Sequence, residues 1–352
     1  MPRITRFLAW PIGVLTLGLG LGLGLGLVAA HAEQMTNIRF VLDWNYEGEE
    51  SEFTVPHEDG TFQRYNLNVQ IDRGAGSGDT VVKVGGGAYD MGYADFYTMV
   101  RFNAEHPDHR LIAVAINQDA SAMGISTLAS SGILKPQDLN GKKIGAPPDA
   151  AKQIFPFFAA INKIDINSIQ WNSVSSDMRD TMLVRGSVDA VTGNVTTTMM
   201  NARAMGVPEG GIRPFIFASY GVPLYGSAII TTPAFAEAHP EAVRNFIRAV
   251  AHGLNVMITN PEAALATVKK YDPLLDDKIE LARIKISLQY MLITDHVRQY
   301  GFSQVDMARL QKTLDDVAPT FGINPPPKAA DVYIDKYLPP AADLKVAAWQ
   351  PG

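Results

Sequence analysis

The stretch IRFVLDWNYEGEESEF, residues 38–53, joins a short apolar run to a loop that carries two aromatic residues and four glutamates. The run from Ile38 to Leu42 has the length and the apolar character of a buried strand. Trp44 and Tyr46 follow it, and the glutamates all fall between positions 47 and 52. Aromatic faces beside carboxylates suit a small ligand that is cationic or donates hydrogen bonds. The stretch therefore predicts a strand that leads directly into a ligand site.

Further short apolar runs predict more buried strands. These runs are Leu67 to Ile71, Leu111 to Ile116, Lys143 to Ala146, Ile169 to Val174, Phe215 to Ala218 and Ser227 to Thr231. Helical patterns lie between many of them, which favours an α/β fold of parallel sheets with helices on their faces. From Pro240 onward the chain is expected to be mostly helical, and Asn260 and Ser303 stand where two later helices should begin.

Composition limits the classes of function. The 352 residues, 47% of them hydrophobic, suffice for two sizeable cores. A net charge of -6 and the lack of a basic run make nucleic acid an unlikely partner. The absence of cysteine excludes disulfides, thiolate metal sites and cysteine nucleophiles.

The N-terminus predicts export. Arg3 and Arg6 precede an apolar run from Phe7 to Ala30, and Ala30-His31-Ala32 forms a small-x-small cleavage site. We expect a signal peptide over residues 1–32 that is cleaved after Ala32, which places the product in the periplasm. The alternative is a retained membrane anchor, because the apolar run is long enough to span a bilayer.

Several motifs in a fixed order resemble the solute-binding proteins of ABC importers. The most similar branch is the thiamine-pyrimidine and sulfonate/nitrate/taurine group, the NMT1/THI5-like family. The motifs are LDW at 42–44, EDGTF at 58–62, NLNVQI at 66–71, GAGSGD at 74–79, GGGAYDMGYADF at 85–96, LKPQDLNGKKIGAPPD at 134–149, RGSVDAVTGN at 185–194 and DVYIDKYLPP at 331–340.

The resemblance implies a two-lobed α/β clamshell of the type II-like periplasmic binding proteins, with a ligand cleft between the lobes. Lobe 1 would comprise residues 33–120 and 225–352, and lobe 2 residues 121–224. Two hinge crossings are expected, near Gln118 to Met123 and near Gly221 to Tyr225. A cleft at the carboxyl ends of parallel strands is also where open α/β sheets bind ligands.

Three departures from the family pattern bear on the ligand. Glu49-Glu50 replaces the Asn-His pair typical of the pyrimidine-binding branch, and Asp95 stands where relatives tend to have a small residue. The loop at 146–151 reads APPDAA, whereas anion-binding relatives offer hydroxyl residues at this helix start. Its prolines remove backbone donors, and Asp149 adds negative charge. We therefore expect a cationic or neutral nitrogen-containing ligand, with a small anion such as a sulfonate, taurine or nitrate as the alternative.

Nine residues are predicted to bind the ligand. They are Trp44, Tyr46, Glu50, Ser77, Asp95, Phe96, Asp149, Asn194 and Tyr225. Each also has a structural interpretation. The glutamates can be helix-start charges, the aspartates can be helix caps, the aromatic residues can belong to the core, and Asn194 and Tyr225 can serve surface or hinge packing.

The competing class of function is an enzyme. The fold group resembles a pyrimidine-synthesising enzyme of thiamine biosynthesis, which relies on an active-site histidine and a cysteine-rich motif. This chain has glutamate at the matching histidine position and no cysteine. The sequence therefore predicts a monomeric receptor that is not an enzyme, needs no cofactor or metal, and delivers its ligand to a membrane permease with an ATPase.

Overall fold

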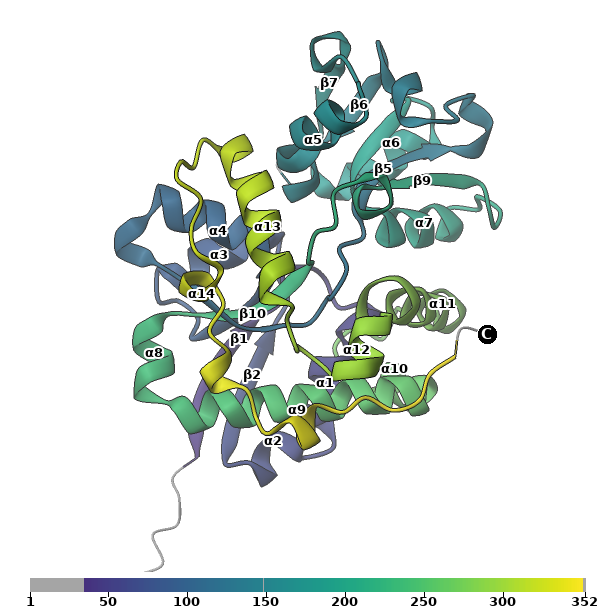
Figure 1. The fold of residues 1–352 in the computed structure, drawn as a ribbon. Helices are drawn as coiled ribbons and strands as arrows, with labels where there is room; N and C mark the ends of the chain where they lie inside the picture. The colour runs from purple at the N-terminus through teal and green to yellow at the C-terminus, as the bar shows by residue number, and fades with distance from the viewer. Residues whose placement is uncertain (1–34, 148, 351–352) are drawn as a thin grey trace, which may run out of the picture. The chain divides into compact units, whose positions relative to one another are not determined.

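Ten strands form two five-stranded sheets in the computed structural model, which describes residues 35–147 and 149–350 (Figure 1). The first sheet has the order β2-β1-β3-β10-β4, with β1 Thr36–Val41, β2 Leu67–Asp72, β3 Met91–Asp95, β4 Ile112–Ile116 and β10 Ser227–Thr231. The second has the order β7-β6-β8-β5-β9, with β5 Met123–Leu128, β6 Lys143–Ala146, β7 Gln170–Ser173, β8 Ala190–Asn194 and β9 Ile212–Ile216. The predicted signal peptide, residues 1–32, lies outside the described residues.

Both sheets are mixed, so the expectation of parallel sheets is wrong in one respect. β1 pairs in parallel with β2 and β3, and β6 pairs in parallel with β7 and β8. β10 and β5 run antiparallel to both of their neighbours. The chain enters the second sheet at β5 and returns to the first sheet at β10. Each of these two entry strands runs opposite to the strands beside it. The α/β class itself is confirmed.

Helices cover the sheets. They are α1 Ser51–Glu58, α2 Thr61–Arg64, α3 Ser77–Gly85, α4 Phe96–Glu105, α5 Ala150–Ile161, α6 Ser176–Val184, α7 Val195–Ala204, α8 Pro233–Ala238, α9 Pro240–Thr259, α10 Pro261–Val268, α11 Asp277–Ser287, α12 Asp295–Tyr300, α13 Met307–Val317 and α14 Ala329–Val332. A π-helical turn, Leu288–Leu292, extends α11. Among the described residues, no helix combines the length and apolar character needed to cross a membrane.

Two element boundaries differ from the sequence prediction. The strand expected at 215–218 is β9, which ends at Ile216, and a 3-10 turn, η6 Phe217–Tyr220, follows it. The helix expected to begin near Ser303 begins at Met307 instead, because Ser303 has a positive φ of 56° and Asp306 caps the helix. Asn260 caps α10 as predicted, by accepting a hydrogen bond from the Ala263 amide.

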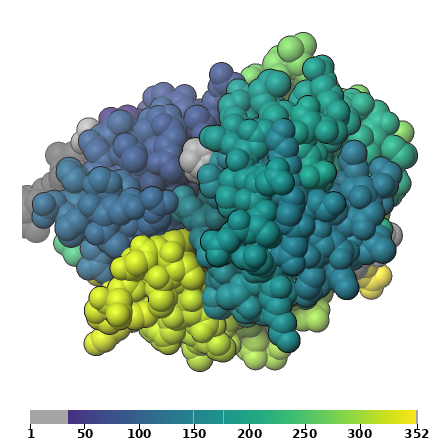
Figure 2. Space-filling model, turned by 90° about the horizontal axis from the view of Figure 1, so that it is seen from above, coloured from purple at the N-terminus to yellow at the C-terminus, as the bar shows by residue number. Residues whose placement is uncertain are grey.

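The core lies on both sides of the sheets. α9 buries a stripe of Val243, Phe246, Ile247, Val250 and Leu254 beside β1 residues such as Phe40. A second cluster joins elements of the two sheets. Figure 2 shows the yellow surface of the C-terminal helices against the teal surface of the middle of the chain, and α13 contacts α5.

The chain passes between the sheets twice, at 117–122 and at 217–226, and Arg309 at the start of α13 joins the two crossings. Its guanidinium donates to the carbonyl oxygens of Asp119 and Leu224, and it lies 3.3 Å from the Asp119 carboxylate. It also stacks 3.9 Å from the ring centre of Tyr225. One side chain therefore holds both crossings in register.

We expect Arg309→Met to lower the free energy of unfolding by about 1–3 kcal/mol, because the variant loses charge-assisted hydrogen bonds and the cation–π contact. Urea denaturation followed by circular dichroism measures this. Lys312→Met on the same helix is the control, since Lys312 forms an exposed pair with Asp316 at 2.7 Å and should change stability by less than about 1 kcal/mol. Equal losses in the two variants would contradict the role assigned to Arg309.

Candidate functional site

A cavity of about 490 Å³ is lined by loops and helix starts of both sheets. The turn after β1 and the start of α3 contribute from the first sheet, and the start of α5 and the β8–α7 junction contribute from the second. The first crossing supplies Gln118 and Ser121. We call this space the carboxylate cavity, after the Asp43, Glu49, Glu50, Asp79 and Asp149 side chains that line it.

The structure brings some of the predicted site residues together at this cavity. These are Trp44, Glu50, Ser77, Asp149 and Asn194. They reach it because each stands at the end of a strand or the start of a helix, where the two sheets face the same space. Pro148, which was predicted to remove a backbone donor here, lies outside the described residues.

The predicted aromatic residues other than Trp44 lie away from the cavity lining. The Tyr46 hydroxyl donates to the Ile71 carbonyl at 3.0 Å, and its ring centre is 4.9 Å from that of Tyr271. Phe96 is fully buried in the core. Tyr225 is buried under Arg309 at the second crossing, where its hydroxyl accepts from the Asp306 amide at 3.0 Å. The positions of all three are explained by packing.

Two of the predicted carboxylates act as helix caps. Asp95 Oδ1 accepts hydrogen bonds from the amide and hydroxyl of Thr98 at 2.7 and 2.9 Å, and it caps α4 outside the cavity lining. Asp149 accepts from the Lys152 amide at 2.8 Å, caps α5 and also lines the cavity. For Asp149 the structural and the site interpretations are therefore compatible. Asn194 likewise caps α7, through the Thr196 amide at 3.0 Å.

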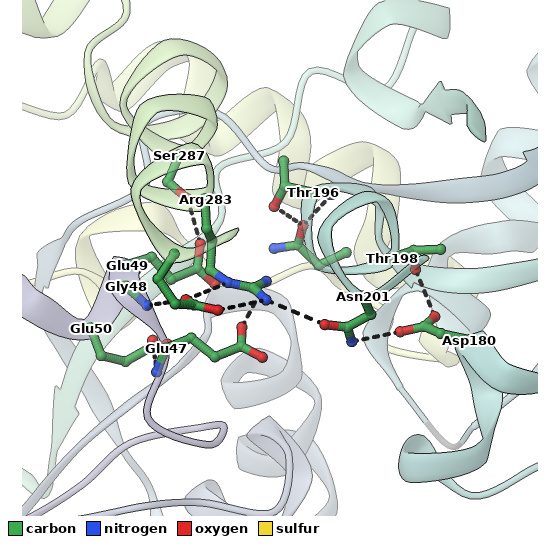
Figure 3. A network of polar contacts seen from close by, with 12 residues as sticks. Glu47, Gly48, Glu49, Glu50, Asp180, Thr196, Thr198, Asn201, Arg283 and Ser287 are labelled. Carbon is green, nitrogen blue, oxygen red and sulfur yellow. Dashed lines mark hydrogen bonds and ion pairs between the residues drawn. The ribbon is translucent and has the colours of Figure 1, made fainter. Parts of the chain in front are cut away.

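The glutamates of the opening stretch form a compact group. One carboxylate oxygen from each of Glu47, Glu49 and Glu50 lies within 4.8 Å of the others. Arg283 on α11 pairs with Glu47 at 2.9 Å (Figure 3). It also pairs with Glu280 at 2.9 Å. Arg283 is thus the resident cation of this group.

Gly48 allows α11 to approach the turn formed by residues 47–50, which we call the glutamate turn. A Cβ at Gly48 would lie 2.6 Å from the Glu280 carbonyl oxygen, so a larger residue would push the helix away. The Gly48 amide donates to Glu280 Oε2 at 2.6 Å, and Ser287 donates to Glu49 at 2.6 Å. These contacts with α11 fix the glutamate turn, and Glu49 and Glu50 also line the cavity.

Sequence reasoning missed Asp43, Tyr93 and Arg179, which also line the cavity. Asp43 Oδ2 accepts from Ser77 Oγ at 3.1 Å, which ties the end of β1 to the start of α3. Its place directly after the first strand is the signal that could have identified it. Arg179 pairs with Asp180 at 2.8 Å, and a Cβ at Gly193, where φ is +143°, would lie 2.2 Å from its guanidinium. No local sequence pattern predicts the close approach of Arg179 to Gly193.

Burial shifts the titration of these carboxyl groups. It raises the pKa of Asp43 to about 7 and that of Asp95 to about 6. The pKa of Glu47 rises to about 7 for the same reason, although Arg283 opposes the shift. The pKa of Glu50 lies well above its ordinary value, because burial is reinforced by the neighbouring carboxylates of Glu49 and Glu47. Of these four residues, Asp43 and Glu50 line the cavity, and a cation beside them would favour their ionised forms.

Comparisons with known proteins agree on the fold and differ on function. The family model NMT1/THI5 like matches residues 51–264. A formylaminopyrimidine-binding protein of Halalkalibacterium halodurans is 25% identical over 241 residues, 67% of this chain and 71% of the relative. The solved alkanesulfonate-binding protein SsuA from Xanthomonas axonopodis pv. citri, bound to MOPS, has a TM-score of 0.65 at 15% identity and covers 86% of this chain and 99% of its own. The predicted periplasmic-binding-protein fold is confirmed.

The expectation that the chain is not an enzyme has to be corrected because of one relative. The 4-amino-5-hydroxymethyl-2-methylpyrimidine phosphate synthase of Legionella pneumophila is 22% identical over 240 residues, 68% of this chain and 75% of the relative. This match contradicts the expectation, drawn from the missing histidine and cysteines, that the chain is not an enzyme.

Proposed function

The chain belongs to the NMT1/THI5-like family, and we propose that it is the substrate-binding component of an ABC importer that captures a small nitrogen-containing ligand, cationic or neutral, in the carboxylate cavity. Its partners are then the ligand, a membrane permease and an ATPase, and its place is the periplasm. Lobe closure over the ligand would stabilise the bound state through contacts from both sheets.

The proposed class of ligand is inferred from the charge of the residues that line the cavity. Asp43, Glu49, Glu50 and Asp149 face the space, and Arg179 is the one Lys or Arg among the described lining residues. Arg179 is already paired, to Asp180 at 2.8 Å. A sulfonate or nitrate would meet repulsion of about 1–4 kcal/mol for each ionised carboxylate within about 4 Å. A protonated amine, or a heterocycle rich in N–H donors, would instead satisfy these acceptors.

The remaining lining residues suit a flat polar ligand. Trp44 offers an aromatic face for stacking or for a cation–π contact, worth about 0.5–2 kcal/mol. Ser77 and Asn194 offer hydrogen-bonding groups from opposite sheets, so a ligand that contacts both would favour closure. We assign ligand contact to Trp44, Glu50, Ser77, Asp149 and Asn194, and we add Asp43.

A ligand panel tests this proposal by thermal shift at pH 8. We expect protonated amines and aminopyrimidines to raise the melting temperature, and taurine and nitrate to leave it unchanged. A ligand at 100 times its Kd stabilises the folded state by about 2.7 kcal/mol. Glu50→Gln should reduce the shift, whereas Glu105→Gln, an exposed carboxylate on α4, should not. Stabilisation by taurine or nitrate alone would refute the proposed ligand class.

The second candidate function is pyrimidine phosphate synthesis, and the observation that favours it is the name of the Legionella pneumophila relative. Mass spectrometry of each stabilising compound after incubation with the protein separates the two functions. A receptor returns the compound unchanged, whereas a synthase converts it to a new mass.

A further inference from the structure

A chain of polar contacts from Glu47 to Asp180 joins elements that belong to the two sheets (Figure 3). It begins at Glu47, which pairs with Arg283 at 2.9 Å. Arg283 Nη2 donates to Asn201 Oδ1 on α7 at 3.3 Å, and Asn201 Nδ2 donates to Asp180 Oδ2 on α6 at 2.8 Å. Asp180 then pairs with Arg179 at 2.8 Å.

One end of this chain, Arg179, lines the cavity, and the other end, Glu47, lies beside residues that line it. These neighbours of Glu47 are Glu49 and Glu50. Arg283 and Asn201 are outside the lining, and Arg283 is only 2% exposed. These two residues therefore connect opposite walls of the site without needing to touch a ligand.

One face of α11 and its π-helical extension brings the walls together. Arg283, Ser287 and Met291 are spaced four residues apart on this face. Ser287 donates to Glu49, which lines the cavity on the side of the first sheet. Met291 contacts Asn194, which lines it on the side of the second sheet. The Met291 sulfur lies 3.8 Å from Asn194 Nδ2, and its carbonyl accepts from the Ala120 amide of the first crossing at 3.2 Å. The same helix thus contacts both walls and a crossing segment.

We propose that the Arg283–Asn201 hydrogen bond is a latch that holds the two sheets closed over the cavity. The partners of Arg283 other than Asn201 are Glu47 and Glu280, which lie on the side of the first sheet, and the partners of Asn201 other than Arg283 include Asp180, on the side of the second. Opening would break the bond between Arg283 and Asn201 while each stays oriented by its own partners. The latch can therefore re-form without reordering either side chain, which lowers its entropic cost.

This inference rests on the proposed function only in treating the cavity as the ligand site, and its test needs no ligand. The chain has no cysteine, so Glu209→Cys near α7 and Glu262→Cys on α10 can carry a pair of spin labels. Both positions are exposed. Pulsed electron paramagnetic resonance of the ligand-free protein then reports the separation of the two sides.

Asn201→Ala should lower the ratio of closed to open populations about tenfold, the effect of losing one hydrogen bond to a charged group. Thr198→Val is the matched control. It removes a 3.0 Å hydrogen bond to the same Asp180 but none that crosses between the sheets, so its distance distribution should match the wild type. Identical distributions for Asn201→Ala and the wild type, or an equal shift in Thr198→Val, would overturn the latch. Failure of the ligand panel would leave this result unaffected.

Discussion

Replacing Arg283 by methionine is expected to lower the free energy of unfolding by about 3–5 kcal/mol at pH 7. Arg283 is one of the largest fully buried side chains, and it pairs with Glu47 and Glu280 at 2.9 Å each. Methionine fills much of the same volume but leaves two buried carboxyl groups without a cation. Urea denaturation of the wild type and the variant measures the loss.

The matched control is Arg101→Met. Arg101 pairs with Glu105 at 2.7 Å on the exposed side of α4, and such a pair contributes about 0–1 kcal/mol. The loss in Arg283→Met should also shrink below pH 6, because the pKa of Glu47 is raised to about 7 and its neutral form needs no cation. A loss no larger than that of Arg101→Met would show that Arg283 is not the ion that neutralises the glutamate turn.

Local sequence pattern was enough to predict many of the strands, including interior ones such as β1 and β10. β6 and β10 have the predicted bounds, and β1, β2 and β4 differ by two residues or fewer at either end. β4 is a continuous apolar run, and β2 alternates apolar and polar residues with a period of two, so both carry a local strand signal. The central strands β3, β5 and β8 contain glycine, serine, threonine or aspartate and were not identified as apolar runs. Their burial is imposed by the helices and strands around them, and no window of local sequence contains that information.

The candidate site shows the same division. Trp44 and Asp149 each stand three residues after the end of a strand, β1 and β6, so position along the chain places them at the cavity. Tyr46 and Phe96 have equally suggestive positions but turn into the core, a choice that depends on neighbours such as Tyr271. Arg283 lies more than 200 residues from the glutamate turn that it neutralises. Such a pairing exists only once the helices have packed. The lobe boundaries and ligand contacts remain predictions.

Glu52→Gln is expected to stabilise the protein at alkaline pH. Glu52, on α1, is 1% exposed, and its Oε2 has no hydrogen-bond partner among the described residues. Burial raises its pKa from 4.5 to about 8. The folded state therefore binds a proton more tightly than the unfolded state, and stability falls as the pH rises from about 4.5 through 8. Glutamine stays neutral and keeps the oxygen that accepts from Asn117 Nδ2 at 3.1 Å in the wild type.

The sign of this effect separates two interpretations of the opening stretch. If Glu52 were a helix-start charge, glutamine would destabilise α1 by about 0.3–1 kcal/mol at pH 8.5. Since the carboxylate is buried, we expect the opposite, a gain of up to about 4 kcal/mol at pH 8.5 that falls to about 1 kcal/mol at pH 5. Urea denaturation at both pH values measures the difference, with Glu105→Gln as an exposed control that should show no such trend. A loss of stability in Glu52→Gln that is larger at pH 8.5 than at pH 5 would restore the helix-start interpretation, because the cost of burying the amide group is the same at both pH values and only the contribution of the charged form changes between them.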